Sequence, residues 1–286
     1  MATVALVVHR GRPEAVRLAH RAVEWLIDGG HRVRLAKEDA DAVDATSRGA
    51  GVEVAEEAAV AAGADLAVSL GGDGTMLRTV ELAVAQDVPV LGVNLGQLGY
   101  LAGVEPGRLC EALDQFLRGE YQEECRLTLQ VEAPGEPALM ALNEGVLEKT
   151  VPGHTVRLAL RLSGEHFISY ACDGLIVSTP TGSTAYNLSA RGPILSPLLQ
   201  ALLVTPVSPH MLFDRSLVLE PTDVVEVEVL EPRPALLVVD GVQARELAPG
   251  AVVRFRAADN AARFVVVDGG AGFHSILKAK FRLADR

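Results

Sequence analysis

Several common features of proteins are scarce in this sequence of 286 residues. It has only three cysteines (Cys110, Cys125 and Cys172) and no CxxC pair, which argues against a disulfide framework and against a cysteine-based zinc site. No apolar run approaches the ~20 residues of a membrane-spanning helix. The short apolar segment at the N-terminus precedes basic residues, which is the reverse of the order in a signal peptide. We therefore expect a cytoplasmic enzyme with no membrane partner.

Positive charge is also scarce. Lysine occurs only at positions 37, 149, 278 and 280, and the formal net charge is −11. A protein that coats nucleic acid concentrates Lys and Arg, so we expect no nucleic-acid partner. A small phosphorylated ligand remains compatible with this composition, because a local site can be electropositive on an acidic protein. Such a site would depend on Arg, backbone N–H groups or a metal ion.

The first 120 residues alternate short apolar segments with segments of helical periodicity. We expect strands at 3–8, 33–36, 65–70 and 88–93, and helices at 14–27, 52–62, 76–85 and 108–117. This alternation predicts a parallel sheet with both faces covered.

After residue 121, many short strands separated by Pro and Gly predict an antiparallel sandwich. One of these expected strands is 262–267. We thus predict an α/β domain with a parallel sheet over residues 1–120, followed by an all-β, sandwich-like domain over 121–271. The tail, 272–286, is expected to return to the first domain as a helix or a strand.

The loop Gly71-Gly72-Asp73-Gly74-Thr75 follows an expected strand and precedes an expected helix. Open parallel sheets bind ligands at the carboxyl ends of their strands, and the helix behind the loop offers N–H groups to an anion. The loop could also be a plain turn with Asp73 or Thr75 as helix cap. Three glycines in four residues exceed what a cap requires, so we favour a phosphate site. Asp73 could accept a proton from a hydroxyl or help to hold Mg²⁺.

A second glycine-spaced loop, Asn94–Tyr100, follows the next expected strand. A glycine loop after a buried strand is commonplace, so this signal alone is weak. Because it lies on the same edge of the sheet as the Asp73 loop, we expect the two loops to form the walls of one crevice.

The segment Asp173–Tyr186 reads DGLIVSTPTGSTAY and joins a strand to a hydroxyl-rich loop. Its five Ser and Thr hydroxyls suit a ligand with ribose and amide groups, and Tyr186 offers a flat face for a base. Each hydroxyl taken singly is better explained as a helix cap or a turn. Asn143-Glu144 places polar groups on an otherwise apolar strand, where a ligand would supply the partners that buried polar groups need. Asp240-Gly241 is expected to be a hairpin turn.

Other familiar sites are absent from the sequence. It contains no GxxxxGK[ST] P-loop, no GxGxxG dinucleotide fingerprint and no HExxH or other metal-ligand spacing of histidines. Cys172 stands beside Asp173 without a histidine nearby in the sequence, so we expect a buried core thiol.

These motifs together resemble those of the NAD kinase family. The resemblance is carried by Gly71–Thr75, Asn94–Tyr100, Asn143-Glu144 and, above all, Asp173–Tyr186 followed by Ser-Ala-Arg191-Gly-Pro. The GGDGT loop alone is less specific, since diacylglycerol kinases, sphingosine kinases and phosphofructokinases carry similar loops. The resemblance covers residues 71 to 243 and implies transfer of phosphate from ATP to the 2′-hydroxyl of the adenosine ribose of NAD⁺. It also implies an α/β domain followed by a β-sandwich, and a homodimer or homotetramer.

The resemblance further implies roles for individual residues. Asp73 would be the base that contacts the 2′-hydroxyl, and Asp173 would contact the nicotinamide side of NAD. Facing the donor phosphates would be Gly72, Gly74 and Thr75. The dinucleotide would be held by Asn143, Glu144, Thr181, Thr184, Ala185, Tyr186, Ser189 and, on a short match, Gln243. No protein ligand to a metal is implied, but Mg²⁺ or another divalent ion is expected because it bridges transferring phosphates.

Two positions depart from the family pattern. Arg191 stands where the family has glycine; if the backbone there adopts a positive φ, Arg is strained by ~1 kcal/mol. Tyr100 stands where Phe is common and adds only a hydroxyl. A non-catalytic NAD(H)-binding sensor and a lipid kinase of the diacylglycerol kinase type remain as alternatives. The sequence leaves open whether ATP or polyphosphate is the donor and whether NADH is accepted.

Overall fold

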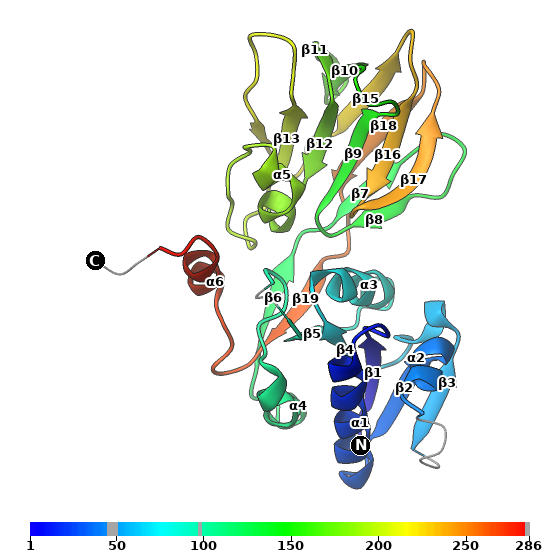
Figure 1. Cartoon of the computed structure of the whole chain (residues 1–286), viewed down its shortest axis with the longest axis vertical. Helices are drawn as coiled ribbons and strands as arrows, with labels where there is room; N and C mark the ends of the chain where they lie inside the picture. Colours follow the sequence, from blue (N-terminus) through cyan, green and yellow to red (C-terminus); the bar gives the residue numbers. More distant parts are fainter. Residues whose placement is uncertain (45–50, 97–98, 284–286) are drawn as a thin grey trace. The chain divides into compact units, whose positions relative to one another are not determined.

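The computed structural model describes residues 1–44, 51–96 and 99–283. The chain forms two compact units. The first combines Met1–Cys125 with Ala262–Arg286, and the second is Arg126–Ala261. Figure 1 shows both units, coloured along the sequence.

The first unit is built on a seven-stranded sheet in the order β3-β2-β1-β4-β5-β19-β6. Its strands are β1 (Thr3–Val8), β2 (Arg32–Ala36), β3 (Val52–Ala55), β4 (Leu66–Gly71), β5 (Val90–Asn94), β6 (Gln122–Arg126) and β19 (Ala262–Val266). The strands from β3 to β19 pair in parallel. Because β2 lies on one side of β1 and β4 on the other, the strand order reverses between β1 and β4. Open sheets bind ligands at the carboxyl ends of strands at such a switch point.

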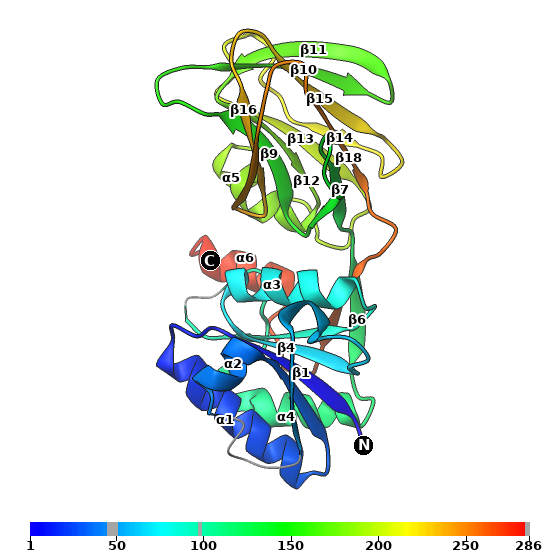
Figure 2. The same cartoon turned by 90° about the vertical axis from the view of Figure 1, so that its right-hand side faces the viewer.

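Helices cover both faces of this sheet. The helices of this unit are α1 (Pro13–Asp28), α2 (Lys37–Ala42), α3 (Asp73–Val84), α4 (Leu109–Leu117) and α6 (Phe273–Lys280), with short 3₁₀ turns η2 (Glu57–Ala59) and η3 (Pro106–Arg108). Alternate residues of β1 (Val4, Leu6, Val8) share one core with apolar residues of α1 and α4. Figure 2 shows α1 and α4 on one side of the sheet and α3 on the other. None of the helices in the described ranges has the length and apolar character to span a membrane.

The prediction of one helix in this unit is wrong. Residues 52–62 were expected to be helical, but Val52–Ala55 form strand β3 and only Glu57–Ala59 form a 3₁₀ turn. Strand β3 pairs in parallel with β2, Val33 opposite Val52 and Leu35 opposite Val54. Pairing with the open edge of β2 overrides the local helical spacing, because strand propensity depends on the neighbouring strand.

The chain returns to the first unit earlier than residue 272. Strand β19 had been expected in the sandwich, but it pairs in parallel with β5, Phe264 opposite Val90. The tail then continues as helix α6. At the other junction, β6 joins the parallel sheet, so the first unit extends to Cys125. Both differences arise because sheet pairing, which the sequence pattern does not contain, decides to which unit a strand belongs.

The second unit consists of two six-stranded antiparallel sheets. One has the order β11-β10-β15-β18-β7-β8 and the other β14-β13-β12-β9-β16-β17. The strands are β7 (Leu129–Glu132), β8 (Leu139–Ala141), β9 (Glu144–Lys149), β10 (Val156–Leu162), β11 (Glu165–Cys172), β12 (Gly174–Ser178), β13 (Leu202–Val207), β14 (Leu217–Leu219), β15 (Val225–Leu230), β16 (Ala235–Val239), β17 (Val242–Leu247) and β18 (Val252–Ala257). After β12 come the 3₁₀ turn η4 (Thr181–Thr184) and the short helix α5 (Tyr186–Ser189).

The two sheets of the second unit enclose a single apolar core. Leu158 and Phe255 contribute from one sheet, and Leu147 and Leu237 from the other. Cys172 lies in this core with no exposed surface, and burial raises the pKa of its thiol to about 12. The interpretation as a core thiol is confirmed, as is the fold class: a parallel α/β domain and an antiparallel β-sandwich.

Candidate functional site

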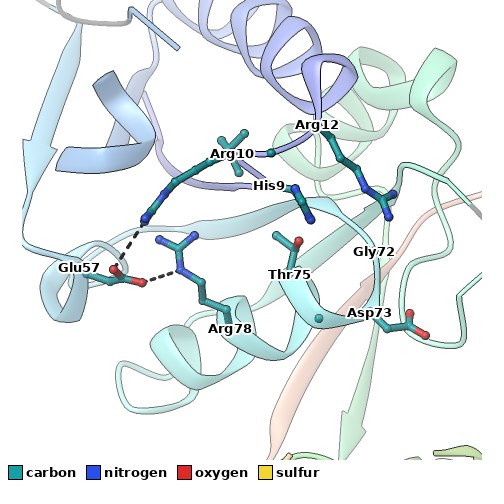
Figure 3. A pocket seen from close by; sticks show the side chains of 11 residues that line it. His9, Arg10, Arg12, Glu57, Gly72, Asp73, Thr75 and Arg78 are labelled. Atoms are coloured by element: carbon teal, nitrogen blue, oxygen red, sulfur yellow. Dashed lines mark hydrogen bonds and ion pairs between the residues drawn. The ribbon is translucent and has the colours of Figure 1, made fainter. Parts of the chain in front are cut away.

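The first unit has a pocket at its topological switch point (Figure 3). The pocket has a volume of about 580 Å³. Its walls are the chain after β1, the Gly72–Thr75 loop after β4, and the side chains of Glu57 and Arg78. The sequence predicted a site at the second of these loops, and the fold places the β1 loop opposite it.

The glycines of the loop differ in what surrounds them. A Cβ atom on Gly71 would lie 2.1 Å from the hydroxyl of Thr75, so this glycine is needed for packing. A Cβ atom on Gly72 or Gly74 would meet no atom within 4 Å. Helix α3 begins at Asp73, which places the first N–H groups of the helix at the pocket, and of these the N–H of Thr75 already donates to the carbonyl of Gly72 at 3.0 Å. Packing therefore does not require glycine at positions 72 and 74, which both line the pocket.

Arginine side chains supply the positive charge that lysine does not. Asp39, whose side chain is 1% exposed, lies 2.6 Å from Nε of Arg10 and 3.3 Å from Nη2 of Arg78. Glu57 bridges the same two guanidinium groups, at 3.7 Å and 2.5 Å (Figure 3). The hydrogen bond to Asp39 raises the pKa of Arg10, so Arg10 stays positively charged. Two guanidinium groups are thereby held at the pocket wall.

Sequence reasoning missed this arginine cluster. Arg10, Asp39 and Arg78 are far apart in the sequence and belong to no motif. The one available signal was the basic stretch directly after the first strand, which ends at the same edge of the sheet as the GGDGT loop. Within that stretch, Arg12 donates a hydrogen bond to the carbonyl of Leu95 and so joins the β1 loop to the loop after β5.

The carboxylate of Asp73 turns toward the loop after β5. Its oxygens accept hydrogen bonds from the N–H groups of Tyr100 (3.0 Å) and Leu101 (3.2 Å). A Cβ atom on Gly99 would lie 2.1 Å from Oδ1 of Asp73, so only glycine fits there. The two loops are therefore adjacent. Gln97 and Leu98, the middle of the Asn94–Tyr100 segment, lie outside the described residues.

In the second unit, a single carboxylate holds the Asn143-Glu144 segment. Asp240 accepts hydrogen bonds from the N–H groups of Leu142 (2.7 Å), Asn143 (2.8 Å) and Glu144 (3.0 Å). Asp240 and Gly241 have φ of 47° and 79° and form the predicted hairpin turn between β16 and β17. Sequence reasoning treated Asp240 only as a turn residue and missed this contact, which joins positions almost 100 residues apart.

Four of the five hydroxyls in the Ser/Thr-rich segment bind backbone carbonyls. Ser178 and Thr179 donate to Asn143 and Leu142 across the strand pair, while Ser183 and Thr184 donate to Leu195 and Thr181. Thr181 is the exception: its side chain is buried, and its hydroxyl has no hydrogen-bond partner in the described part of the chain. These four hydroxyls therefore shape the loop.

Glu144 is the second buried polar side chain with an open bonding position. The residue is 6% exposed, and its Oε2 atom has no partner among the residues that the structure describes. Burial, followed by the negative charge of Asp240, raises its pKa to about 8. The backbone N–H of Tyr186 partly opposes this shift by donating a hydrogen bond to the carboxylate.

The other predicted site residues of this unit range from buried to exposed. Asp173 is half-buried and forms an ion pair with Lys149 at 2.6 Å. Thr184 is buried, Ala185 is intermediate, and Tyr186 and Ser189 are exposed on α5. Gln243 is exposed on the edge strand β17, whereas it is Asp240 that reaches the Asn143-Glu144 backbone.

Arg191 adopts the left-handed conformation that the sequence raised as a possibility. Its φ is 65°, and it follows Ala190, the residue that caps α5. The next residue must be glycine for a different reason, because a Cβ atom on Gly192 would lie 1.9 Å from Oδ1 of Asn187. Asn187 is buried and donates to the carbonyls of Ser183 and Pro193. The turn is thus fixed by packing around Asn187, and Arg191 carries the strain.

Family models match both units. Residues 4–121 match the ATP-NAD kinase N-terminal domain, and residues 142–267 match the ATP-NAD kinase C-terminal domain. The chain is 38% identical over 296 residues to the NAD kinase of Nocardia farcinica, which covers 98% of the chain and 91% of that relative. It is 40% identical over 288 residues to NAD kinase 2 of Streptomyces coelicolor, covering 98% and 94%.

Two solved structures share the fold. Yeast NADH kinase, complexed with NADH, gives a TM-score of 0.87 at 24% identity and covers 100% of this chain and 89% of that one. An NAD kinase from Archaeoglobus fulgidus, in complex with ATP, gives a TM-score of 0.70 at 24% identity and covers 92% of each chain.

Proposed function

The chain belongs to the NAD kinase family, and on this premise we propose that it transfers the terminal phosphoryl group of ATP to the 2′-hydroxyl of the adenosine ribose of NAD⁺. The products are NADP⁺ and ADP. One structural observation carries the proposal: Asp73 lies between two glycines that packing does not require, at the N-terminus of a helix that faces a pocket with two fixed guanidinium groups.

The donor phosphates belong to the first unit in this proposal. The backbone N–H groups of Gly72 and Gly74 bind phosphate oxygens, as helix N-termini do. Thr75 lines the same pocket, but its own N–H donates to the carbonyl of Gly72 at 3.0 Å. Arg10 and Arg78 add positive charge at the same pocket, where positioning and charge stabilisation account for most of the catalysis of phosphoryl transfer. Their carboxylate partners, Asp39 and Glu57, keep both guanidinium groups in place before the donor arrives.

NAD⁺ belongs to the second unit. The residues proposed to hold it are Asn143, Glu144, Asp173, Thr181, Thr184, Ala185, Tyr186, Ser189 and Gln243. Support comes from the two open bonding positions on Glu144 and Thr181. In the transfer, the ribose oxygen forms a bond to the γ-phosphorus while the bond from that phosphorus to the β–γ bridging oxygen breaks. Asp73 accepts the hydroxyl proton, and the electron pair of the broken bond leaves on ADP.

A divalent cation fits this site only together with the donor. Among the described residues no group of three or more His, Cys, Asp or Glu side chains could hold a metal ion. Of the two pocket carboxylates, Glu57 is paired with the positive charges of Arg10 and Arg78, whereas Asp73 accepts only neutral backbone N–H groups, so Asp73 is the group that would contact the ion. Mg²⁺ commonly binds through one carboxylate and the substrate phosphates, and bound there it neutralises charge on the transferring group. The protein's own residues bind, orient and deprotonate the substrates.

We further propose that the enzyme acts in the cytoplasm on small-molecule substrates and assembles as a homodimer or homotetramer. Large apolar side chains exposed on the second unit support an assembly. They include Leu198 (49% exposed), Leu212 (103%) and Val218 (56%). Light scattering during gel filtration tests this, and a monomer at micromolar concentration would contradict it.

The experiment that tests the function is NADP⁺ formation from NAD⁺ and Mg²⁺, with ATP and polyphosphate in parallel. We expect product with ATP, and the parallel reaction shows whether polyphosphate replaces it. Lipid vesicles serve as a competing acceptor, since phosphate on lipid and none on NAD would indicate a lipid kinase. NAD binding without product from either donor would favour a non-catalytic sensor.

A further inference from the structure

Two carboxyl groups lie close together at the start of strand β9. Asp240 accepts a hydrogen bond from the backbone N–H of Glu144, and its negative charge acts on the Glu144 side chain. Two neighbouring carboxyl groups in a poorly solvated place do not both ionise easily, so one of them keeps a proton. The structure distinguishes which one.

Asp240 has the surroundings of a carboxylate anion. It accepts hydrogen bonds from three successive N–H groups, those of Leu142, Asn143 and Glu144, at 2.7 to 3.0 Å. Donated hydrogen bonds stabilise the ionised form of a carboxyl group. These three backbone N–H groups therefore stabilise the negative charge of Asp240.

Glu144 has the surroundings of a neutral acid. It is 6% exposed, it has no ion pair among the described residues, and its Oε2 atom bonds to nothing in them. A single backbone N–H, that of Tyr186, reaches its carboxyl group. An anion with so little compensation is costly to bury, whereas a neutral carboxyl group with a free O–H needs only one acceptor.

The charged and titratable groups around the site do not alter this assignment. Tyr186 from α5 and Asp240 from the β16–β17 turn face Glu144. The charges of Glu148, Lys149 and Asp173 also act on Tyr186, and the one cation of this set, Lys149, is paired with Asp173 at 2.6 Å. The local balance of charge is therefore negative, and it disfavours a second anion.

We propose that Glu144 binds NAD⁺ as a neutral carboxylic acid that donates a hydrogen bond to the dinucleotide, so that binding weakens when Glu144 ionises. The inference rests on the proposed function, because NAD⁺ is the ligand. NAD⁺ offers acceptors in its ribose, phosphate and adenine groups, and a neutral Glu144 adds no negative charge that would repel its pyrophosphate. The raised pKa of Glu144, about 8, agrees with this assignment and sets the pH at which binding changes.

The test is calorimetric titration of the full-length protein with NAD⁺, without ATP, from pH 6.5 to 9.5. We expect constant affinity on the acidic side of about 8 and a loss approaching about tenfold per pH unit on the basic side. Near pH 8 the wild type takes up a fraction of a proton on binding, measured by comparing buffers of different ionisation enthalpy. Tyr186 and Cys172 do not interfere, since burial raises the pKa of both.

Two variants make the test specific to Glu144. In Glu144→Gln, the amide still donates but does not titrate, so the pH dependence and the proton uptake both disappear. Glu148→Gln, on the same strand and only partly buried, keeps the wild-type pH profile. Affinity that is independent of pH in the wild type, or a Glu144→Gln variant with the wild-type profile, overturns the inference and leaves the proposed function intact. Absence of NAD⁺ binding at every pH overturns the proposed function instead.

Discussion

The carboxylate of Asp73 accepts a hydrogen bond from the backbone N–H of Tyr100 at 3.0 Å. A second bond from Leu101 and the close approach of Gly99 complete the contact. The side chain at the centre of the GGDGT loop is thus oriented by the loop after β5 before any substrate binds. Preorganisation of this kind is what a group acting on a reacting hydroxyl needs, because reorientation during the reaction would cost free energy.

Replacing Asp73 by Asn tests its role as the base. The Asn carbonyl still accepts one of the two backbone hydrogen bonds, so we expect a folded protein that binds NAD⁺ normally. Turnover should fall by about 100-fold or more, because an amide cannot take the hydroxyl proton. Steady-state NADP⁺ formation and thermal unfolding measure the two effects. The exposed Glu81→Gln on the same helix is the control, and a rate for Asp73→Asn close to that of this control would remove Asp73 from the proposed role.

Replacing the glycines of the loop by Ala should affect either stability or ATP binding, depending on the position. In Gly71→Ala the new methyl group would collide with Thr75, so we expect the free energy of unfolding to fall by about 1–3 kcal/mol. In Gly74→Ala the methyl group enters open space within the first turn of α3, where Ala favours helix, so stability is kept or gains up to ~1 kcal/mol. Its KM for ATP should nevertheless rise, because the phosphates lose access to the backbone. Equal loss of stability in both variants would contradict this division.

Arg191 offers a test of backbone strain. A non-glycine residue in the left-handed region costs roughly 1–2 kcal/mol, and part of this is offset because glycine gives the unfolded chain more freedom. We therefore expect Arg191→Gly to raise the free energy of unfolding by up to ~1 kcal/mol, while Arg191→Ala, which keeps the Cβ atom at φ 65°, does not. Chemical denaturation of the three proteins measures this. Equal stability of the Gly and Ala variants would show that the turn is not strained.

The buried Glu144 makes stability depend on pH in a defined direction. Its pKa is about 8 in the folded protein against 4.5 for an ordinary glutamate. Between these values the folded protein keeps a proton that the unfolded chain has released, so the free energy of unfolding falls as the pH rises through this window. Above pH 8 the loss levels off.

Glu144→Gln should lack this contribution, so the stability difference between variant and wild type grows in favour of the variant by a few kcal/mol from pH 5 to pH 8. Urea unfolding at several pH values measures the difference, in which the other titrating groups cancel. Parallel curves for the two proteins would mean that Glu144 is already ionised in the fold.

The α/β unit shows which parts of the fold were readable from local pattern. Strands β1, β4 and β5 and helices α1, α3 and α4 lie where apolar spacing put them, to within a few residues. Residues 52–62 were misread because they pair with an open sheet edge, and β19 was assigned to the other unit because its partner, β5, is distant in the sequence. Local periodicity reports how a segment buries its own side chains, but not which strand it meets.

The candidate site divides in the same way. The sequence by itself determined which chemical groups are present. These are the glycines that leave the backbone accessible, Asp73 between them, and the hydroxyl-rich and Asn-Glu segments suited to a dinucleotide. Only the tertiary structure decided that Arg10 and Arg78 share Asp39, that Asp240 holds Asn143-Glu144, and that Thr181 alone of five hydroxyls has an open position. The reason is physical. A residue type and its immediate neighbours fix what a group can do, whereas burial, pairing and charge state depend on groups that the fold brings from far along the chain.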